Sequence, residues 1–307
     1  MHALVDGDIP LYSCGFAAQK NKYSVGYTTY GDVVCVDCDN KKEANKIAEQ
    51  MEGEVFTTIE VEPLANALHN VDTLMNKILE TTLSDTFGVF ISGKGNFREG
   101  LVDNYKANRD PTHKPHWYSE IKSHLIRNYG AVVVDGQEAD DAMSIAQWAS
   151  FRDEEAEPTI ICTIDKDLDM VPGYHYNWNK DEIYEVGLLQ GTRCFYKQII
   201  KGDKSVDNID GLYHLTKKKA TKKVLAPIES MEDEKDMWSY VLGLFEGIDE
   251  DVVITNARLL WMRREEDEIW SPPQEPSEEV YGQTAQVPST WTEEELQEAE
   301  GLDKGVV

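Results

Sequence analysis

The stretch TIICTIDKDLDM, residues 159–170, starts as an apolar run and ends in acids at alternate positions. Three more short apolar runs, each followed by glycine or aspartate, lie at 3–5, 88–92 and 131–134. Patterns with helical spacing fill the intervals, at 62–82, at 116–129 and from about residue 138. Short buried strands that alternate with amphipathic helices are typical of a parallel α/β sheet, and we expect the chain to contain one.

The length and composition are those of a globular protein. With 307 residues, 41% of them hydrophobic, the chain is long enough for two modest domains or one large one. It has no apolar run of about 18 residues, and its start, MHALVDGDIP, lacks the charged and apolar regions of a signal peptide. We therefore expect a soluble, unexported cytoplasmic protein with no membrane partner.

The five cysteines are an odd number scattered along the chain, which fits reduced thiols better than a disulfide framework. Cys35 and Cys38 form a C-x-x-C pair, but no second Cys or His pair at zinc spacing follows. We expect them to be ordinary half-buried thiols near a turn.

The net charge of −27 argues against a polyanionic partner, because nucleic acid would be repelled. The charge is unevenly distributed, however. Residues 94–127 and 197–223 are locally basic, and acid is concentrated after Trp270. The objection to nucleic acid is therefore weaker for the two basic segments.

The pattern divides the chain into three parts. Sheet and helix signals alternate over 1–195, with a β-hairpin inserted at 20–37, and only helical patterns follow over 196–270. Residues 271–307 are rich in proline, serine and glutamate, so we expect an acidic flexible tail with a short helix near 292–299.

Carboxylates follow the predicted strands where each strand ends. In an open parallel sheet the carboxyl ends of the strands meet at one edge, and ligands bind there. Four groups of acids fall at this edge or at the entry to the helical part: Asp6 and Asp8; Glu138, Asp140 and Asp141; Asp165 and Asp167; Asp203 and Asp207. Any one group fits a helix cap, but four groups converging on one place indicate a binding site.

Converging carboxylates raise one another's pKa values unless cations lie among them. Oxygen ligands without His or Cys favour Mg²⁺ or Mn²⁺ over zinc. Two such ions about 4 Å apart can activate water and stabilise the leaving oxygen of a phosphodiester. A calcium-binding EF-hand over 165–176 is excluded by its spacing, because Met170 replaces the loop glycine and Tyr176 replaces the bidentate glutamate.

Five motifs stand in order along residues 3–270: VDGD (5–8), NFREGLVDNYKANR (96–109), QEADDAMSIAQ (137–147), TIDKDLDMVPG (163–173) and KGDKSVDNIDGL (201–212). In this order they resemble the flap endonuclease/5′–3′ exonuclease superfamily, most closely the stand-alone bacteriophage 5′–3′ exonucleases. The resemblance implies a PIN-like or resolvase-like, mainly parallel α/β sheet flanked by helices, in a catalytic nuclease domain over 1–195. It also implies a small helix-hairpin-helix-type DNA-binding domain over 196–270.

The resemblance further implies roles for individual residues. Two metal ions would lie among six acids, Asp6, Glu138, Asp140, Asp141, Asp165 and Asp167, with Asp203 and Asp207 completing the second site. Arg98, Lys106 and Arg109 would hold the scissile phosphate and offset its charge in the transition state.

The same resemblance implies a helical arch or gateway over about 94–127, drawn mainly from 110–127, through which single-stranded 5′ ends pass. Lys114 would bind DNA there, and stacking faces for unpaired bases would come from His113, His116, Trp117 and Tyr118. The alternative is a proline-containing loop that leads into a helix whose aromatic side chains pack inward.

The sequence departs from the family pattern at three places. Ser92 stands where many relatives carry an aspartate, so the cluster loses one charge. Asp203 and Asp207 are four apart where the family usually has three, a spacing that a helical turn absorbs. Of the family's glycine-rich turn, which grips duplex phosphates around a K⁺ ion, only Gly211 remains.

Five lysines near Gly211 are therefore expected to hold the duplex by charge: Lys217, Lys218, Lys219, Lys222 and Lys223. The alternative is that they form a solvated helix face. A K⁺ ion near Gly211 is what the resemblance implies.

Together these features predict a Mg²⁺-dependent 5′-nuclease, with Mn²⁺ as a substitute, that hydrolyses DNA from 5′ ends and flaps without a covalent intermediate. For a phage protein the setting would be DNA replication, primer removal or DNA degradation in the host-cell cytoplasm. RNA primers would be a further substrate, and the acidic tail would bind replication proteins. Two alternatives remain: a branched-DNA binding protein that has lost its active centre, and a PIN-like ribonuclease.

Overall fold

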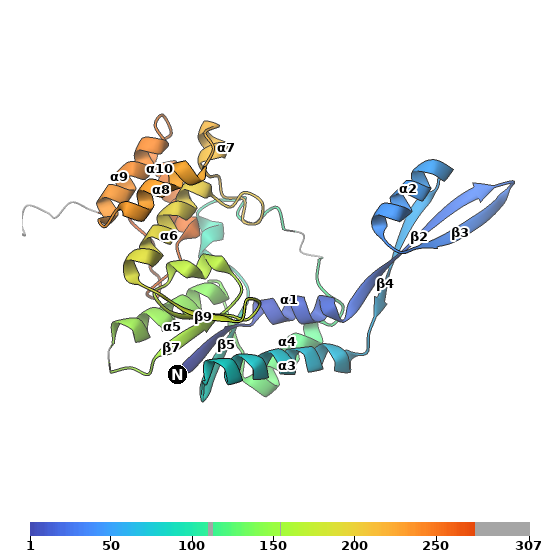
Figure 1. The fold of residues 1–307 in the computed structure, drawn as a ribbon, viewed down its shortest axis with the longest axis horizontal. Helices are drawn as coiled ribbons and strands as arrows, with labels where there is room; N and C mark the ends of the chain where they lie inside the picture. Colours follow the sequence, from blue (N-terminus) through green and yellow to red (C-terminus); the bar gives the residue numbers. More distant parts are fainter. Residues whose placement is uncertain (110–112, 154, 274–307) are drawn as a thin grey trace, which may run out of the picture. The chain divides into compact units, whose positions relative to one another are not determined.

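The computed structural model describes residues 1–109, 113–153 and 155–273. Its centre is a sheet flanked by helices (Figure 1). This sheet has six strands in the order β6-β5-β1-β7-β8-β9. The strands are β1 (His2–Asp6), β5 (Thr86–Ser92), β6 (Val132–Val134), β7 (Thr159–Cys162), β8 (Gly173–Asn177) and β9 (Glu182–Val186). All neighbours are parallel except β8 and β9, so the predicted mainly parallel α/β sheet is confirmed.

The side chains of β1 alternate between two cores, as the period of a strand requires. Ala3 and Val5 face a core formed with three helices, α1 (Asp8–Ala17), α3 (Leu64–Thr82) and α4 (Tyr118–Tyr129). Leu4 faces the other core, where α5 (Ala139–Arg152) and the C-terminal helices pack. Helices therefore cover both faces of the sheet, which fits the apolar centres of β1 and β7.

The chain after the sheet is helical. Its helices are α6 (Leu188–Lys201), α7 (Leu212–Thr216), α8 (Lys222–Ser230), α9 (Glu234–Leu244) and α10 (Glu250–Leu260); two short 3-10 helices, η1 (Phe97–Gly100) and η2 (Lys166–Met170), lie earlier. Phe195, Trp238 and Trp270 share a core with Leu4 of the sheet, and Met1–Ser271 form one compact unit. No helix among the described residues is long and apolar enough to cross a membrane.

The predicted boundary after residue 195 falls inside α6, and the division of the chain into two domains stays a prediction. Of the predicted tail, 274–307 lie outside the described residues.

The insertion predicted as a hairpin is a separate three-stranded antiparallel sheet in the order β3-β2-β4. Its elements are β2 (Gln19–Thr29), β3 (Asp32–Cys38), β4 (Glu54–Val61) and α2 (Lys41–Met51). The hairpin at 20–37 is confirmed, whereas the sequence pattern does not predict β4 and α2. Cys35 and Cys38 are three positions apart on β3, so their side chains point to opposite faces of this sheet.

Candidate active site

The carboxyl ends of neighbouring strands bring acids from distant parts of the sequence together. Asp6 is the last residue of β1, and Asp8 begins α1 two residues later. Asp165 caps η2 just beyond β7, the strand beside β1. Glu138 is the N-cap of α5, and Asp140 lies in the first turn of that helix. Three segments thus meet at one edge of the sheet.

Two adjoining cavities lie at this edge. The first, the sheet-edge pocket, has a volume of about 720 Å³ and is lined by acids that include Asp6 and Asp8. The second, the turn pocket, has a volume of about 710 Å³ and is lined by acids that include Asp167, Asp203 and Asp207. The pockets adjoin, because five side chains line both: Lys106, Arg109, Glu138, Asp140 and Asp165.

Burial and mutual repulsion make it costly for these carboxyls to carry charge. Burial, followed by the charge of Asp8, raises the pKa of Asp6 to about 7. Burial and the charge of Asp6 raise the pKa of Asp140 well above its usual value. Burial and the charge of Asp165 raise the pKa of Asp167 to about 6. A cation placed among them would offset this cost.

The donor set fits a hard divalent cation, because carboxylate oxygens are the ligands that Mg²⁺ and Mn²⁺ prefer. A further buried oxygen, Oε1 of Gln198, has no hydrogen-bond partner among the described residues, while its Nε2 atom donates to Asp167 at 2.7 Å. Within the described ranges, no three His, Cys, Asp or Glu side chains are already grouped as metal ligands. The acids are bonded instead to local donors, such as the Thr163 hydroxyl, which donates to Asp6 at 2.8 Å.

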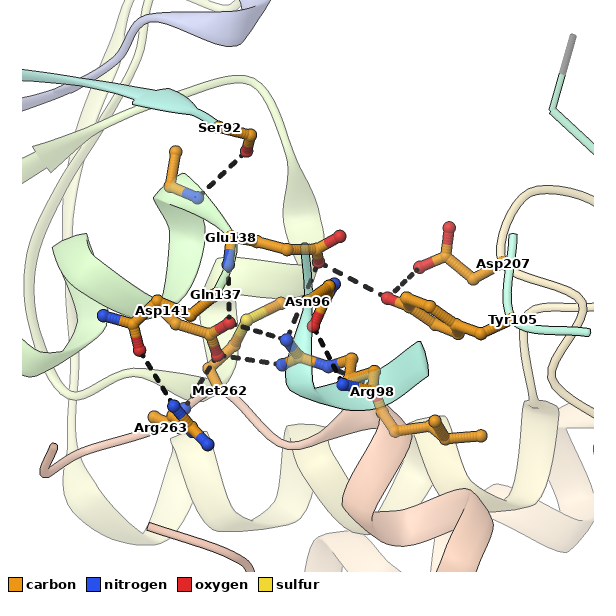
Figure 2. A network of polar contacts seen from close by, with 12 residues as sticks. Ser92, Asn96, Arg98, Tyr105, Gln137, Glu138, Asp141, Asp207, Met262 and Arg263 are labelled. Atoms are coloured by element: carbon orange, nitrogen blue, oxygen red, sulfur yellow. Dashed lines mark hydrogen bonds and ion pairs between the residues drawn. The ribbon is translucent and has the colours of Figure 1, made fainter. Parts of the chain in front are cut away.

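Lys106 and Arg109 lie between the acids of the sheet and those of the turn. The Lys106 ammonium group forms ion pairs with Glu138 and, at 3.9 Å, with Asp207. Arg109 pairs with Asp207 at 2.6 Å. The Tyr105 hydroxyl lies 3.4 Å from the carboxylates of both Glu138 and Asp207 (Figure 2). Lys106 and Arg109 line both pockets, so their positive charges lie where an anionic ligand can contact them.

Asp203 and Asp207 lie on the turn that joins α6 to α7. The Asp207 N–H donates to the Asp203 carbonyl at 3.2 Å, which closes one helical turn, and both side chains line the turn pocket. Gly211 follows where two backbone segments meet. A Cβ atom there would lie 1.9 Å from the Lys201 carbonyl oxygen, so only glycine fits. The K⁺ ion near Gly211 stays a prediction.

Arg98 and Asp141 differ from the other predicted site residues, because neither lines either pocket. Their exposed fractions are 1% and 0%. Nη1 and Nη2 of Arg98 donate to the two carboxylate oxygens of Asp141 at 2.6 and 2.8 Å (Figure 2). The two charges therefore neutralise each other in the interior. Direct contact of Asp141 with a metal ion, or of Arg98 with a phosphate, does not fit this arrangement.

Aromatic side chains form one wall of the sheet-edge pocket. Tyr12 and Phe16 are one turn apart on α1 and line the pocket, and the Phe16 ring lies 5.0 Å from that of His113. Lys114 lines the same pocket with its ammonium group 4.6 Å from the centre of the Tyr118 ring. The sheet-edge pocket therefore has aromatic rings and the positive charge of Lys114 in its lining, together with its acids.

The segment predicted as an arch is only partly described, because 110–112 lie outside the described residues. From Tyr118 on it forms α4, whose Ile121 and Leu125 are buried in the core. Trp117 donates from Nε1 to the Glu62 carbonyl at 2.9 Å. The part from Trp117 on is thus packed against the protein, and an arch or gateway over 94–127 stays a prediction.

The five lysines expected to hold duplex DNA lie outside both pockets and are all exposed: Lys217, Lys218, Lys219, Lys222 and Lys223. They follow α7 or begin α8, so they form one exposed basic stretch of chain. Contact of this stretch with DNA stays a prediction.

Asp8 and Gln198 line the pockets but are absent from the eight predicted metal ligands, although Asp8 belongs to the first of the four acidic groups. The Asp8 carboxylate accepts the Ser92 N–H, with both oxygens at 3.2 Å, and so lies beside the position where the expected aspartate is missing. Its signal in the sequence was its place two residues after Asp6. Gln198 lines the turn pocket from α6, and a single polar residue on an amphipathic helix carries no such signal.

Comparison with solved structures finds likenesses to proteins of bacteriophage T5. The T5 5′-exonuclease with zinc bound is 15% identical, with 85% of this chain and 89% of that chain covered and a TM-score of 0.48. A variant of the T5 5′-exonuclease is 14% identical over 84% of this chain and 86% of that chain, with a TM-score of 0.49. The T5 flap endonuclease in a complex with DNA and metal ions is 14% identical, with 84% of this chain and 88% of that chain covered and a TM-score of 0.47.

No protein-family model matches the chain, and a search of curated proteins finds no match.

Proposed function

We propose that this chain is a divalent-metal-dependent nuclease of the flap endonuclease/5′–3′ exonuclease superfamily, which hydrolyses DNA phosphodiesters at 5′ ends and flaps. One observation carries the proposal. Acids from four segments of the chain, and two cations from a fifth, line two adjoining pockets at the edge of the sheet. The five ordered motifs support the choice of superfamily. They also support a setting in phage DNA replication, primer removal or DNA degradation.

The acids divide between two metal positions. Asp6, Asp8 and Glu138 would contribute to the sheet-edge position, and Asp167, Asp203 and Asp207 to the turn position, with Asp140 and Asp165 between them. Mg²⁺ is the proposed ion and Mn²⁺ its substitute. When bound, a pair of such ions activates water and offsets the charge of the leaving oxygen.

The remaining pocket residues would bind and orient the DNA. Lys106 and Arg109 would hold the scissile phosphate, because their charges face both pockets. Tyr12 and Phe16 offer faces on which an unpaired base can stack, and Lys114 can neutralise a neighbouring phosphate. The exposed lysines around α7 and α8 would hold the duplex by charge.

Ser92 motivated the idea of a binding protein without activity, and its surroundings weaken that idea. Its hydroxyl accepts the Ala139 N–H at 3.0 Å, so it ties β5 to the start of α5. Asp8 brings a carboxylate to the same place. The sheet-edge pocket therefore has a carboxylate, that of Asp8, beside Ser92.

The test is cleavage of a duplex with a 5′ flap in Mg²⁺ and in Mn²⁺, with DNA and RNA flaps compared. We expect products with 5′ phosphates from the DNA flap. An Asp140→Asn/Asp165→Asn variant should cut more than about 100-fold more slowly, because it loses two carboxylates that line both pockets. Asp85 is exposed and directly precedes β5, so Asp85→Asn is the matched control. This control should cut the flap as fast as the wild type does.

Three outcomes would contradict this assignment. Wild-type protein that binds the flap but releases nothing with either ion would be a DNA-binding protein. Cleavage confined to the RNA flap would indicate a ribonuclease. Cleavage that persists in the double variant would place the active site elsewhere.

A further inference from the structure

We infer that Arg98 is a positioning residue, which fixes the acids of the pockets from inside the protein and does not touch the substrate. The inference rests on the proposed function and assigns Arg98 a role within that site. It is carried by a buried network around the guanidinium group, drawn in Figure 2.

The guanidinium group of Arg98 has its donors committed to protein acceptors. Besides its two bonds to Asp141, Nε donates to the Leu259 carbonyl at 2.8 Å and Nη2 donates to the Trp261 carbonyl at 2.6 Å. Nη1 also lies 3.8 Å from the carboxylate of Glu138. Four of the five N–H groups are thus hydrogen-bonded, and the fifth, on Nη1, lies on the side of Glu138. The side chain is 1% exposed and lines neither pocket, so it does not reach a phosphate bound there.

The first consequence concerns the start of α5. Oδ2 of Asp141, held by Arg98, accepts the Glu138 N–H at 3.2 Å and so caps the helix. Glu138 and Asp140 flank this capped turn, and both line the two pockets. The direction of these two carboxylates therefore depends on the Arg98–Asp141 pair.

The second consequence concerns the segment after α10. Arg98 binds the carbonyls of Leu259 and Trp261, and the Arg263 N–H donates to Oδ1 of Asp141 at 3.2 Å. Leu260 and Met262, between these anchors, line the turn pocket. One guanidinium group thus connects the acidic wall of the turn pocket to its apolar wall.

Lysine cannot replace arginine in this network. Arginine presents five N–H groups in a rigid planar fork, whereas lysine presents three from a single nitrogen. Four acceptor atoms lie around the fork, namely two oxygens of Asp141 and the carbonyls of Leu259 and Trp261. Arg98→Lys keeps the charge but loses the geometry, which makes it the informative substitution.

The experiment compares Arg98→Lys with Lys106→Met, which removes a cation from the pockets themselves. For each protein, kcat and KM are measured on a 5′-flap duplex in Mg²⁺, and Mn²⁺ affinity is measured by calorimetry without DNA. For Arg98→Lys we expect kcat and Mn²⁺ affinity each to fall about 10- to 100-fold, with KM for DNA within about twofold of the wild type. Lys106→Met should slow cleavage without weakening Mn²⁺ binding.

An Arg98→Lys variant with wild-type Mn²⁺ affinity and a raised KM would overturn the inference, because that pattern belongs to a direct phosphate contact. An Arg98→Met/Asp141→Leu variant covers the case in which Arg98→Lys does not fold, since replacing both buried charges by apolar side chains of similar size is often tolerated. It should unfold cooperatively yet bind Mn²⁺ about 10-fold or more weakly, and wild-type affinity in it would equally overturn the inference. Failure of the wild type to cut DNA would reject the proposed function and leave the Mn²⁺ comparison to decide the role of Arg98.

Discussion

At the scale of single residues, several acids of the pockets accept hydrogen bonds from the protein and line the same cavities. The two oxygens of Asp6 accept the Asp8 N–H at 3.1 Å and the Thr163 hydroxyl at 2.8 Å. Asp165 accepts the Asp167 N–H at 2.9 Å. A carboxylate has about four lone-pair sites, so these bonds fix each group and leave sites for a metal ion. The protein thus orients Asp6 and Asp165 itself, although no three acids of the described residues are yet grouped around one metal position.

Asp8 offers a direct test of this arrangement. An Asp8→Asn substitution keeps an oxygen that can accept the Ser92 N–H but removes the charge. We therefore expect the fold to persist and the affinity for Mn²⁺ to fall by about 10-fold or more. Calorimetric titration of Mn²⁺ into the variant, the wild type and Asp85→Asn measures this. If Asp8→Asn and the Asp85→Asn control bind Mn²⁺ equally well, Asp8 does not belong to the site.

The motifs predict which acids come near the pockets, but not which charges pair with each other. Glu138 and Asp141 have the spacing of a capping box, and Asp141 indeed caps the helix. That spacing was the available signal that Asp141 turns toward the helix end. Its partner Arg98 is 43 residues away in the sequence, so no local pattern indicates the buried pair.

At the scale of elements, continuous apolar runs identify four of the parallel strands, including the edge strand β6, whose Val132 and Val133 are exposed. The runs at 3–5, 88–92, 131–134 and 159–164 correspond to β1, β5, β6 and β7. The strands β4, β8 and β9 are not predicted, because polar and exposed residues interrupt them. They are antiparallel or lie near the end of the sheet, where one face or edge meets water, and a short alternating pattern is then a weak signal.

The strand β8, which the sequence pattern does not predict, carries His175, whose pKa changes when the chain folds. Nε2 of His175 in β8 donates to the Val171 carbonyl at 2.8 Å, and Nδ1 has no partner among the described residues. Burial lowers the pKa of His175 below its ordinary value of 6.5, although Val171 and the charge of Asp169 oppose the shift. The unfolded chain therefore binds this proton more readily, so the contribution of His175 to the free energy of unfolding should be lost as the pH drops through 6.5. The raised pKa values of Asp6 and Asp167 act in the opposite direction, so the contribution of His175 is measured against a variant that lacks it.

Urea unfolding of the metal-free protein at about pH 7.5 and about pH 5.5 measures this loss. His175→Gln keeps a side-chain donor for Val171 and cannot titrate. From about pH 7.5 to about pH 5.5, the wild type should therefore lose stability relative to His175→Gln. Equal changes in the two proteins would show that His175 does not contribute to the pH dependence.

At the scale of the whole molecule, a strongly acidic chain places its cations where an anionic substrate is proposed to bind. The net charge is −27, yet Lys106, Arg109 and Lys114 line the sheet-edge pocket. The acids of the two pockets come from positions as far apart as Asp6 and Asp207, and they meet only when the chain is folded. Metal binding should therefore be coupled to folding of the whole unit.

This coupling gives a prediction with a definite size. An ion that binds only the folded chain stabilises it by mass action, so Mg²⁺ at about 100 times its Kd should raise the free energy of unfolding by about 2.7 kcal/mol. Urea titrations in MgCl₂ and in EDTA measure the gain. Asp140→Asn/Asp165→Asn should lose most of it, whereas Asp85→Asn should keep it. Many exposed acids of a chain with charge −27 can bind Mg²⁺ weakly, and such binding would stabilise the double variant as much as the wild type. An equal gain in both would therefore place the metal outside the two pockets.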